Sequence, residues 1–534
     1  MSGVRVANRR GGGGWPTRRR RELLGRGRFL ALGVALALSY GVVVAADAAA
    51  AKGDLTQKAG TAGCISDDGS GGVCVDGRAL VTAVEVTVSP DGTSAYVASM
   101  DSDAVVVFDR AADGALTQKA GTAGCVSETG AGPCADGTAL ELASSVTVSP
   151  DGENVYVASG DVNDSVPGGA VAVFDRAADG ALTQKAGAAG CISESGAGGC
   201  ADGTALDGAF SVTASPDGAS VYVAAGDSDA VAVFERAADG TLTQKAGTAG
   251  CVSETGAGPC ADGRGLDLAD AVTVSPDGEN AYVASNDSDA VAVFDRAADG
   301  TLTQKVGTAG CVSETGADNC QDGQGLVNAT SITVSPNGES AYVGLAVFDR
   351  AADGTLTQKA GTAAGGAVSV TVSPDGESAY AVASNGVSVF DRAADGTLTQ
   401  KAGTAGCVSE TGAAPCADGR ALHGAISVTV SPDGENVYAA SFWSAAVSVF
   451  DRATAGSTSP PADGDGGGVA GAADACPAVA ATLSNGCVAV TGSTAVPVFA
   501  PVALAPAPAA PGSVGDDVEP GAPLITGSRS VGNA

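Results

Sequence analysis

The sequence predicts an all-β protein, a seven-bladed β-propeller of four-stranded antiparallel blades, and two repeated motifs support this prediction. Ser-Pro-Asp-Gly (once Ser-Pro-Asn-Gly) occurs seven times, and Leu-Thr-Gln also occurs seven times. Most copies of the first motif lie about 60 residues apart. Self-similarity at a fixed period indicates a repeat architecture, and β-repeats of this length are typical of a propeller. The first motif begins at Ser89, Ser149, Ser215, Ser275, Ser335, Ser373 and Ser431.

The repeat around Ser275 shows how one blade is expected to form. In its first strand Val alternates with small or polar residues, which is the period of a half-buried strand. Asp277-Gly278 then supplies the positive φ that a tight hairpin turn needs. Two further strands follow, and a short Leu-Thr-Gln strand completes the four antiparallel strands of a blade. The four strand patterns cover residues 271–275, 280–285, 290–294 and 301–304.

The two ends of the repeat region predict how the ring closes. The first Leu-Thr-Gln, residues 55–57, precedes the first complete repeat, and the last repeat ends at Arg452 without such a strand. We therefore expect the N-terminal strand to complete the seventh blade, which leaves no open sheet edge. Every repeat also has a Tyr in its second strand and a Phe-x-Arg at the end of its third. This pattern predicts a Tyr and a Phe between neighbouring sheets and a structural role for the Arg.

The composition divides the chain into three parts. A basic stretch, an apolar run at 29–46 and small residues at Ala46 and Ala48 predict a cleaved secretory signal peptide. An uncleaved membrane anchor is the alternative, and Arg20-Arg21 fits a twin-arginine export signal. The C-terminal part is rich in Ala, Gly and Pro, which predicts a disordered tail. The expected parts are a signal peptide at 1–48, the propeller at 49–453 and the low-complexity tail at 454–534.

Fourteen cysteines indicate an oxidising compartment. Twelve form six local pairs between a fourth strand and the next first strand, and a seventh pair lies in the tail. Zinc is a poor alternative because the spacing is too wide for a Cys-x2-Cys site and the chain has one His. We expect disulfide bonds and a secreted or cell-envelope location. The expected bonds join Cys64 with Cys74, Cys125 with Cys134, Cys191 with Cys200, Cys251 with Cys260, Cys311 with Cys320, Cys407 with Cys416 and Cys476 with Cys487.

The formal net charge of −32 restricts the expected partners. An acidic surface repels nucleic acid and anionic lipid, so we expect no nucleic-acid partner and no membrane insertion of the mature chain. Asp-Ser-Asp loops at Asp101, Asp227 and Asp287 offer hard oxygen ligands, so calcium is one alternative. No twelve-residue calcium loop is present, and Asp-Gly is also a turn signal. We therefore expect no resident cofactor or metal.

A ligand site in a symmetric ring should lie where the repeats differ. Charged residues interrupt the pattern just before or early in several first strands, where they should line the mouth of the central channel. A general base at the only His is possible chemistry, but no Ser-His-Asp order accompanies it. Blade five lacks a loop at 342–348 and blade six lacks a disulfide loop at 361–366, which predicts a notch at these two adjacent blades. The predicted site residues are Glu85, Asp207, Asp267, Asp270 and His423.

The run Ser-Pro-Asp-Gly, Val-Tyr-Val-Ala-Ser, Ala-Val-Ala-Val-Phe and Asp-Gly-Thr-Leu-Thr-Gln resembles the seven-bladed propeller lactonase family and related Tyr-Val-rich repeat propellers. The resemblance covers about residues 54–452. It implies the propeller fold, and lactone-opening or lactone-forming enzymes such as 6-phosphogluconolactonases and carboxymuconate cyclases, which use His, Arg and Glu clusters in a cleft. No catalytic residue can be matched individually.

Two classes of function follow. The first is a secreted, disulfide-braced binding or scaffold module at the cell exterior that recognises a protein, a glycan or a cation. The second is a lactonase or cyclase acting on a small lactone at the channel mouth. Near-uniform repeats favour the first class, because catalysis needs different groups that converge at one point.

Overall fold

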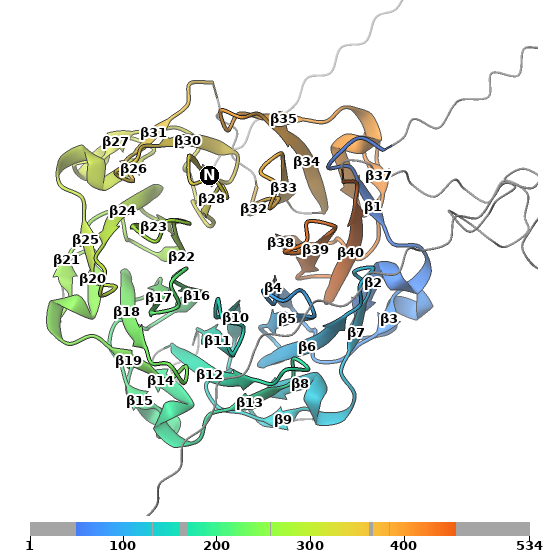
Figure 1. Cartoon of the computed structure of the whole chain (residues 1–534), viewed down its shortest axis with the longest axis horizontal. Coiled ribbons are helices and arrows are strands. Elements are labelled where there is room, and N and C mark those ends of the chain that lie inside the picture. The colour runs from blue at the N-terminus through green and yellow to red at the C-terminus, as the bar shows by residue number, and fades with distance from the viewer. Residues whose placement is uncertain are drawn as a thin grey trace, which may run out of the picture. The chain divides into compact units, whose positions relative to one another are not determined.

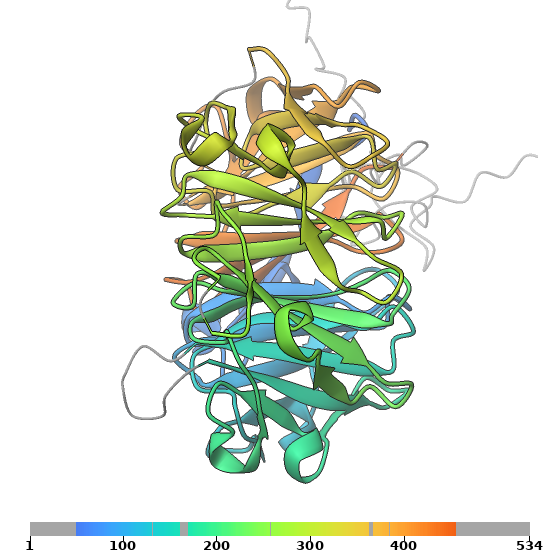
Figure 2. The same ribbon diagram turned by 90° about the vertical axis from the view of Figure 1, so that its left-hand side faces the viewer.

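The computed structural model describes residues 50–130, 132–160, 169–256, 258–361, 367–383 and 385–454. Within them seven β-sheets follow one another around a closed ring (Figure 1), which confirms the predicted seven-bladed β-propeller. The sheets are stacked face against face around the ring (Figure 2). The predicted signal peptide, the loop at 161–168, almost all of the tail and the predicted bond between Cys476 and Cys487 lie outside the described residues. No helical turn in the described part has the length and apolarity that a membrane crossing requires.

Three strands of each blade form an antiparallel meander from the channel outwards. In the order of blades one to seven, the innermost strands are β4 (Ala83–Val88), β10 (Ala143–Val148), β16 (Ala209–Ala214), β22 (Ala269–Val274), β28 (Thr333–Val334), β32 (Ser369–Val372) and β38 (Ala425–Val430). The second strands are β5 (Ser94–Ser99), β11 (Asn154–Ser159), β17 (Ser220–Ala225), β23 (Asn280–Ser285), β29 (Ser340–Val343), β33 (Ser378–Ala383) and β39 (Asn436–Ser441). The third strands are β6 (Ala104–Arg110), β12 (Ala170–Arg176), β18 (Ala230–Arg236), β24 (Ala290–Arg296), β30 (Ala346–Arg350), β34 (Gly386–Arg392) and β40 (Ala446–Arg452).

The outer strand differs from the simple fourth strand that the sequence predicts. In six blades it is divided: the Leu-Thr-Gln segment pairs with the end of the third strand, and a Cys-initiated segment pairs with its beginning. A two-residue strand then adds in parallel, so these sheets have six strands. The Leu-Thr-Gln strands are β1 (Leu55–Gln57), β7 (Leu116–Gln118), β13 (Leu182–Gln184), β19 (Leu242–Gln244), β25 (Leu302–Gln304), β31 (Leu356–Gln358) and β35 (Leu398–Gln400).

Disulfide bonds brace these rims. Six bridges join the first residue of each Cys-initiated strand to the cysteine just before its parallel partner, with Cα–Cα distances of 4.7–4.8 Å. All six predicted pairings outside the tail are therefore confirmed. The second cysteines of the bridges are Cys74, Cys134, Cys200, Cys260, Cys320 and Cys416. The rim strands are β2 (Cys64–Ser66), β3 (Val75–Asp76), β8 (Cys125–Ser127), β9 (Ala135–Asp136), β14 (Cys191–Ser193), β15 (Ala201–Asp202), β20 (Cys251–Ser253), β21 (Ala261–Asp262), β26 (Cys311–Ser313), β27 (Gln321–Asp322), β36 (Cys407–Ser409) and β37 (Ala417–Asp418).

Short 3-10 turns connect the rim strands. They are η1 (Gly60–Gly63), η2 (Gly69–Gly72), η3 (Gly121–Gly124), η4 (Gly187–Ala189), η5 (Ala197–Gly199), η6 (Gly247–Ala249), η7 (Gly307–Gly310), η8 (Ala317–Asn319) and η9 (Gly403–Gly406). The turns that precede a Cys-initiated strand begin with a glycine of positive φ, such as Gly307 at +62°, a conformation that other residues rarely adopt.

The ring closes through the N-terminal strand, as predicted. β1 pairs antiparallel with β40, which places Leu55 opposite Arg452 and Gln57 opposite Phe450. β2 also pairs with β40, so the beginning of the described chain supplies the whole outer part of blade seven. This closure removes the exposed edges that an open sheet would present for aggregation.

Blade five, which is β28 to β31, is the exception. It keeps four strands, but β28 has two residues and the blade has no described rim strands. Apart from β2 and β3, each pair of rim strands joins the third strand that precedes it in the chain. The missing disulfide loop at 361–366 follows β31, so it belongs to blade five and not to blade six. Both irregularities of the sequence therefore fall in one blade. A cavity of about 260 Å³ lies beside it, lined by Val327, Gly344, Ala367 and Val368 among others.

Seven core clusters lie one between each pair of neighbouring blades, and two smaller clusters surround disulfide bridges of the rim. Each of the seven contains the Tyr of one blade and the Phe of the next, for example Tyr222 with Phe294. Val and Ala fill the remaining space, as Val231 and Val283 do in that cluster. Both aromatic residues of this cluster are fully buried, which confirms their predicted place between sheets.

The Arg after each Phe locks neighbouring blades together. Arg296 Nε donates to the hydroxyl of Tyr222 on the preceding blade at 2.7 Å, and that hydroxyl donates to the carbonyl of Gly300 at 2.8 Å. Arg296 also donates to the Gly278 carbonyl of its own blade and to Asp217 of the preceding one. All seven blades repeat the Arg-to-Tyr bond, from Arg110 to Tyr438, Arg176 to Tyr96, Arg236 to Tyr156, Arg296 to Tyr222, Arg350 to Tyr282, Arg392 to Tyr342 and Arg452 to Tyr380.

Charge strengthens this interlock. Burial of Asp217 opposes ionisation, but hydrogen bonds from Ser215, the Ala219 amide and Arg296 outweigh it and lower the pKa of Asp217. Burial raises the pKa of Tyr222, although Arg296 acts in the opposite direction. The phenol therefore stays protonated and can donate to Gly300 while it accepts from Arg296. The Arg is structural in every blade, as its sevenfold recurrence predicts.

Replacing Tyr222 with Phe tests the interlock. The substitution leaves a buried guanidinium N–H and the Gly300 carbonyl without their partner, so we expect the free energy of unfolding to fall by about 1–3 kcal/mol. Denaturant unfolding measures this loss. Val306→Ala is the control, because Val306 is 89% exposed and its removal should change stability by less than about 0.5 kcal/mol. Equal stabilities for the two variants would contradict a structural role for the Tyr hydroxyl.

Candidate binding site at the channel mouth

A central cavity of about 510 Å³ runs between the innermost strands of all seven blades. One position on each blade stands at the same end of this channel, and we call these seven residues the mouth ring. Elsewhere in the channel the blades repeat Val and Thr at fixed positions, whereas the mouth ring differs in almost every blade. The mouth ring consists of Val84, Ser144, Phe210, Asp270, Thr330, Val368 and Ile426.

A β-bulge forms at the mouth ring in most blades. In blade four the pairing of β22 with β23 shifts between Ala269 and Ala271, which leaves Asp270 as the extra residue. The same shift occurs at Val84, Ser144, Phe210 and Ile426. A bulge bends the strand and redirects the side chain of its extra residue, and bulges are common beside functional sites. The fold therefore presents the variable residue of each of these blades to the cavity.

In blades three and four the side chain of the mouth-ring residue lies against the first residue of the loop between the second and third strands. Asp270 is hydrogen-bonded to the side chain of Asn286. Phe210 instead faces Gly226, where an added Cβ would lie 2.4 Å from the ring. The polar Asp270 thus lies beside the polar Asn286, and the bulky ring of Phe210 lies beside Gly226, which has no side chain.

Blades seven and one form an apolar side of the mouth, which we call the apolar arc. Met100, Ile426 and Phe442 all pack against the core cluster that contains Val84. Trp443 follows Phe442 and contacts it edge to face at 4.6 Å between ring centroids, yet it remains 69% exposed. Sequence reasoning missed this arc, although Phe442-Trp443 is the one aromatic pair in a loop that elsewhere reads Asp-Ser-Asp or similar.

Blade four forms the opposite, polar side of the mouth. Figure 1 shows β22 across the channel from β4 and β38. Burial raises the pKa of Asp270 to about 6, since it outweighs the hydrogen bond from Asn286, and Asp287 adds repulsion. Burial, together with repulsion from Asp229 and Asp287, also raises the pKa of Asp267. The residues described around the central cavity include no Lys or Arg that could neutralise these carboxylates.

Glu85 occupies a position that Ser fills in most other blades. Ser145 and Ser211 accept hydrogen bonds from the backbone of the next blade, from Val212 and Val272 respectively. Glu85 accepts the equivalent bond from Val146 at 2.7 Å. Burial raises its pKa, despite the bonds from Ser145 and Val146. Glu85 therefore lines the cavity but substitutes for a Ser in the contact between blades one and two.

The other three predicted site residues lie at the outer margin of the mouth and not among the residues that line the cavity. Each uses its backbone N–H to bind the central Ser of the loop between the second and third strands. His423 is exposed, and its ring centroid lies 6.4 Å from that of Trp443. The bonds run from Asp207 to Ser228, from Asp267 to Ser288 and from His423 to Ser444.

The Asp-Ser-Asp loops have a structural use of their own. Asp229 accepts a hydrogen bond from the backbone of Leu268 on the next blade at 2.9 Å, and Asp103 does the same for Leu142. Both Leu residues have positive φ, +52° and +55°, and the carboxylates hold them there. In the part of the chain that the structure describes, no three His, Cys, Asp or Glu side chains are placed to hold a metal ion.

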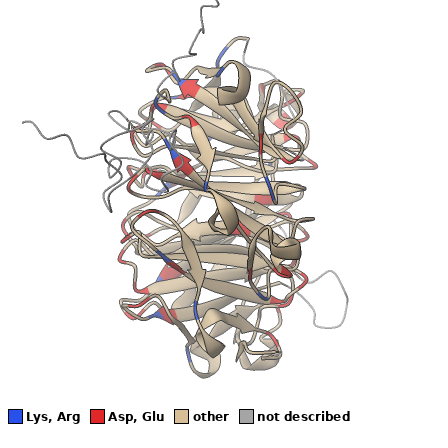
Figure 3. Ribbon diagram, turned by 90° about the vertical axis from the view of Figure 1, so that its right-hand side faces the viewer, with Lys and Arg blue, Asp and Glu red and all other residues tan. Residues whose placement is uncertain are grey.

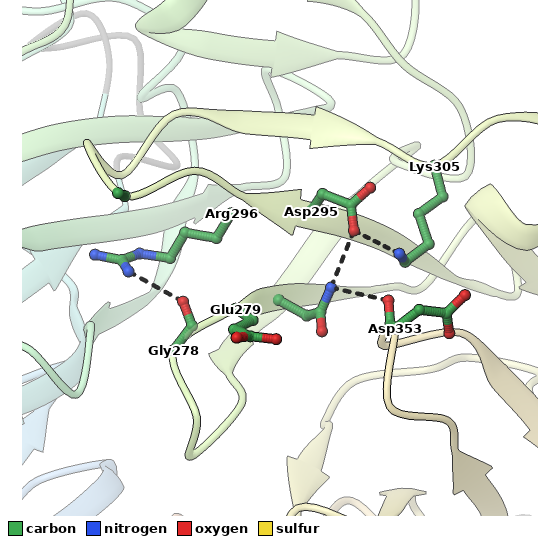
Figure 4. A pocket seen from close by; sticks show the side chains of 8 residues that line it. Gly278, Glu279, Asp295, Arg296, Lys305 and Asp353 are labelled. Carbon is green, nitrogen blue, oxygen red and sulfur yellow. Dashed lines mark hydrogen bonds and ion pairs between the residues drawn. The ribbon is translucent and has the colours of Figure 1, made fainter.

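A second large pocket, of about 580 Å³, lies between blades four and five near their Ser-Pro turns (Figure 4). Several of its polar groups are already paired with one another. Asp295 accepts from Lys305, and Asn280 bridges Asp295 and the Asp353 carbonyl. The same Asp–Lys pair recurs in other blades, for example Asp175 with Lys185. The pocket is therefore part of the repeated structure, and the channel mouth remains the candidate site.

Comparisons with known proteins give likeness at the level of the fold. No family model and no curated protein matches the chain. A protein of Bacteroides fragilis assigned as a 6-phosphogluconolactonase shares 20% identity, covers 70% of this chain and 90% of its own, and has a TM-score of 0.44. The periplasmic gluconolactonase of Pseudomonas aeruginosa shares 19% over 66% and 88% of the two chains, also at 0.44. The hydrazine synthase of Kuenenia stuttgartiensis shares 16% over 71% and 97%, again at 0.44.

Exchanging Glu85 for Ser tests the account of that residue. Because burial raises the pKa of Glu85 in the folded state, the folded chain binds its proton more tightly, and this group lowers stability as the pH rises. We expect Glu85→Ser to raise the melting temperature at pH 7.5 by roughly 1–3 °C and to have less effect at pH 4.5.

Glu279→Ser at an exposed turn is the control and should change neither value. A Glu85→Ser variant that is less stable than the parent at pH 7.5 would show that the carboxylate itself is needed between the blades.

Proposed function

We propose that this chain is an exported binding module that recognises its partner with the channel mouth. One observation supports this most directly. The residues that recur in all seven blades are used to hold the ring, whereas those that break the repetition gather at one mouth. A site that is built once on a symmetric scaffold is where a specific ligand would be recognised.

Features away from the mouth support the export part of the proposal. Six disulfides fit an extracellular protein, because such bonds persist in oxidising compartments. The predicted signal peptide would provide the route. Asp and Glu residues are spread over many loops of the ring (Figure 3), and with a net charge of −32 they disfavour nucleic acid as the partner.

The exposed indole of Trp443 suggests how a partner would be held. An aromatic side chain at the edge of a concave site contributes much of the affinity in many interfaces. Trp443 packs on Phe442 and lies beside His423, so the ring is presented with little freedom to lose on binding. A protein loop or a glycan would both present a surface that an indole can cover.

Binding to isolated cell-envelope material tests this proposal. The purified chain should bind envelope protein or glycan, and Trp443→Ala should weaken binding at least about tenfold, as expected for an aromatic anchor. Val306→Ala is the matched control, since it removes another exposed apolar side chain far along the rim. Equal binding by the two variants would mean that the mouth is not the recognition surface.

A lactonase is the second candidate, and Asp270 is the observation that favours it. Its carboxyl lines the cavity and has a pKa of about 6, close to the value that a general base needs near neutral pH. In this function Asp270 would take a proton from the water that attacks a lactone carbonyl. The mouth offers few donors to stabilise the resulting oxyanion, which is why binding is the preferred proposal.

A panel of small lactones separates the two candidates. If the chain is a lactonase, turnover should rise as the pH increases through about 6, because the base acts in its ionised form. Asp270→Asn should then reduce turnover by about 100-fold or more, whereas His423→Ala should leave it unchanged. Absence of turnover with every lactone, together with envelope binding, would remove the enzyme from consideration.

A further inference from the structure

The channel mouth has two chemically different halves. The apolar arc of blades seven and one offers Val84, Met100 and Ile426, which line the cavity, while Phe442 packs against the same core cluster. Across the channel, blade four offers the Asp270 carboxylate, which lines the same cavity. The cavity of about 510 Å³ is within the range of small-molecule sites, about 300–1,000 Å³. The cavity therefore has room for one small ligand.

Among the described residues that line the cavity, the polar half has no positive charge and has unused hydrogen-bonding capacity. Asp270 is bonded to Asn286 and repelled by Asp287. On the neighbouring blade the hydroxyl of Ser331, which also lines the cavity, is buried and has no hydrogen-bond partner in the structure. The same position on blades two and three uses its Ser to bind the next blade. The Ser331 hydroxyl is therefore free to form a hydrogen bond with a group in the cavity.

The aromatic ring of Phe210 adds a third element. It stands at the mouth-ring position of blade three, next to Asp270 on blade four. A ring face attracts a cation, and a carboxylate beside it attracts the cation further. An ammonium group has three N–H donors, which suit the Asp270 carboxylate, the Asn286 amide oxygen and the Ser331 hydroxyl.

We propose that the channel mouth binds a small primary amine with an apolar body, its ammonium at Asp270 and its body against the apolar arc. This inference rests on the proposed function and specifies the ligand class of that site. An anionic ligand would face Asp270 and Glu85 without a compensating cation. A neutral ligand would leave the Asp270 charge and the Ser331 hydroxyl unpaired, which is costly in a buried site.

Calorimetric titration of the purified chain with n-hexylamine at pH 7.5 and physiological salt tests the inference. Hexylamine should bind, hexanol should bind at least about tenfold more weakly, and hexanoate should not bind, since only the amine pairs with the carboxylate. Methylamine, which lacks the apolar body, should also bind weakly. Hexanol or hexanoate binding as well as hexylamine would overturn the proposal.

Variants locate the site. Asp270→Asn should weaken hexylamine binding at least about tenfold, and Asp262→Asn, an exposed carboxylate on the rim, should not. Met100→Ala should weaken hexylamine binding but leave methylamine unchanged, which gives a second variant if Asp270→Asn fails to fold. Equal losses in the two Asp variants would indicate general attraction to an acidic surface and overturn the proposal.

The outcome also separates this inference from the proposed function. If the chain binds envelope material through Trp443 but no amine, the amine proposal fails and the binding function stands. If it binds neither, both fail.

Discussion

The contact between Arg and Tyr of neighbouring blades is the interaction on which the rest of the structure depends. Each Arg reaches from the end of one sheet to the hydroxyl of a Tyr on the preceding sheet, and the hydroxyl passes the bond on to a glycine carbonyl. Because both side chains are buried, a ring that failed to close would leave such groups unpaired at its two ends. The interlock therefore favours the closed ring and stabilises each contact between blades.

Because the blades are held together in the same way, they can carry different residues only at positions outside these contacts. The strand interiors and the Ser-Pro turns are used in the same way seven times, so a change there affects packing between sheets. The bulge at the start of most innermost strands is different, because its extra residue pairs with nothing in the ladder. Side chains such as Phe210 and Asp270 could diverge at this point without disturbing the interlock. The chemistry of the mouth thus comes from residues that do not take part in holding the blades together.

Much of the fold could be predicted from the sequence because its signals are local and repeated. The Leu-Thr-Gln count predicted the closure of the ring at residue 55, and the Cys spacing predicted the rim bridges. The divided outer strand could not be predicted, since three-residue segments such as Cys311–Ser313 have no readable period. The mouth was predicted in part: Glu85 and Asp270 line the cavity, but the pairing of Asp270 with Asn286 depends on a register shift that pattern alone does not reveal.

The strand that closes the ring also determines when folding can be completed. Leu55 pairs with Arg452, so the first strand to leave a ribosome or a translocation channel must wait for the last one. The rim bridges are different, because each joins cysteines only nine or ten residues apart. They can form one by one as the chain emerges, before the ring is closed. A chain cut short before blade seven would carry intact bridges on an open arc, with an unpaired strand edge at its end.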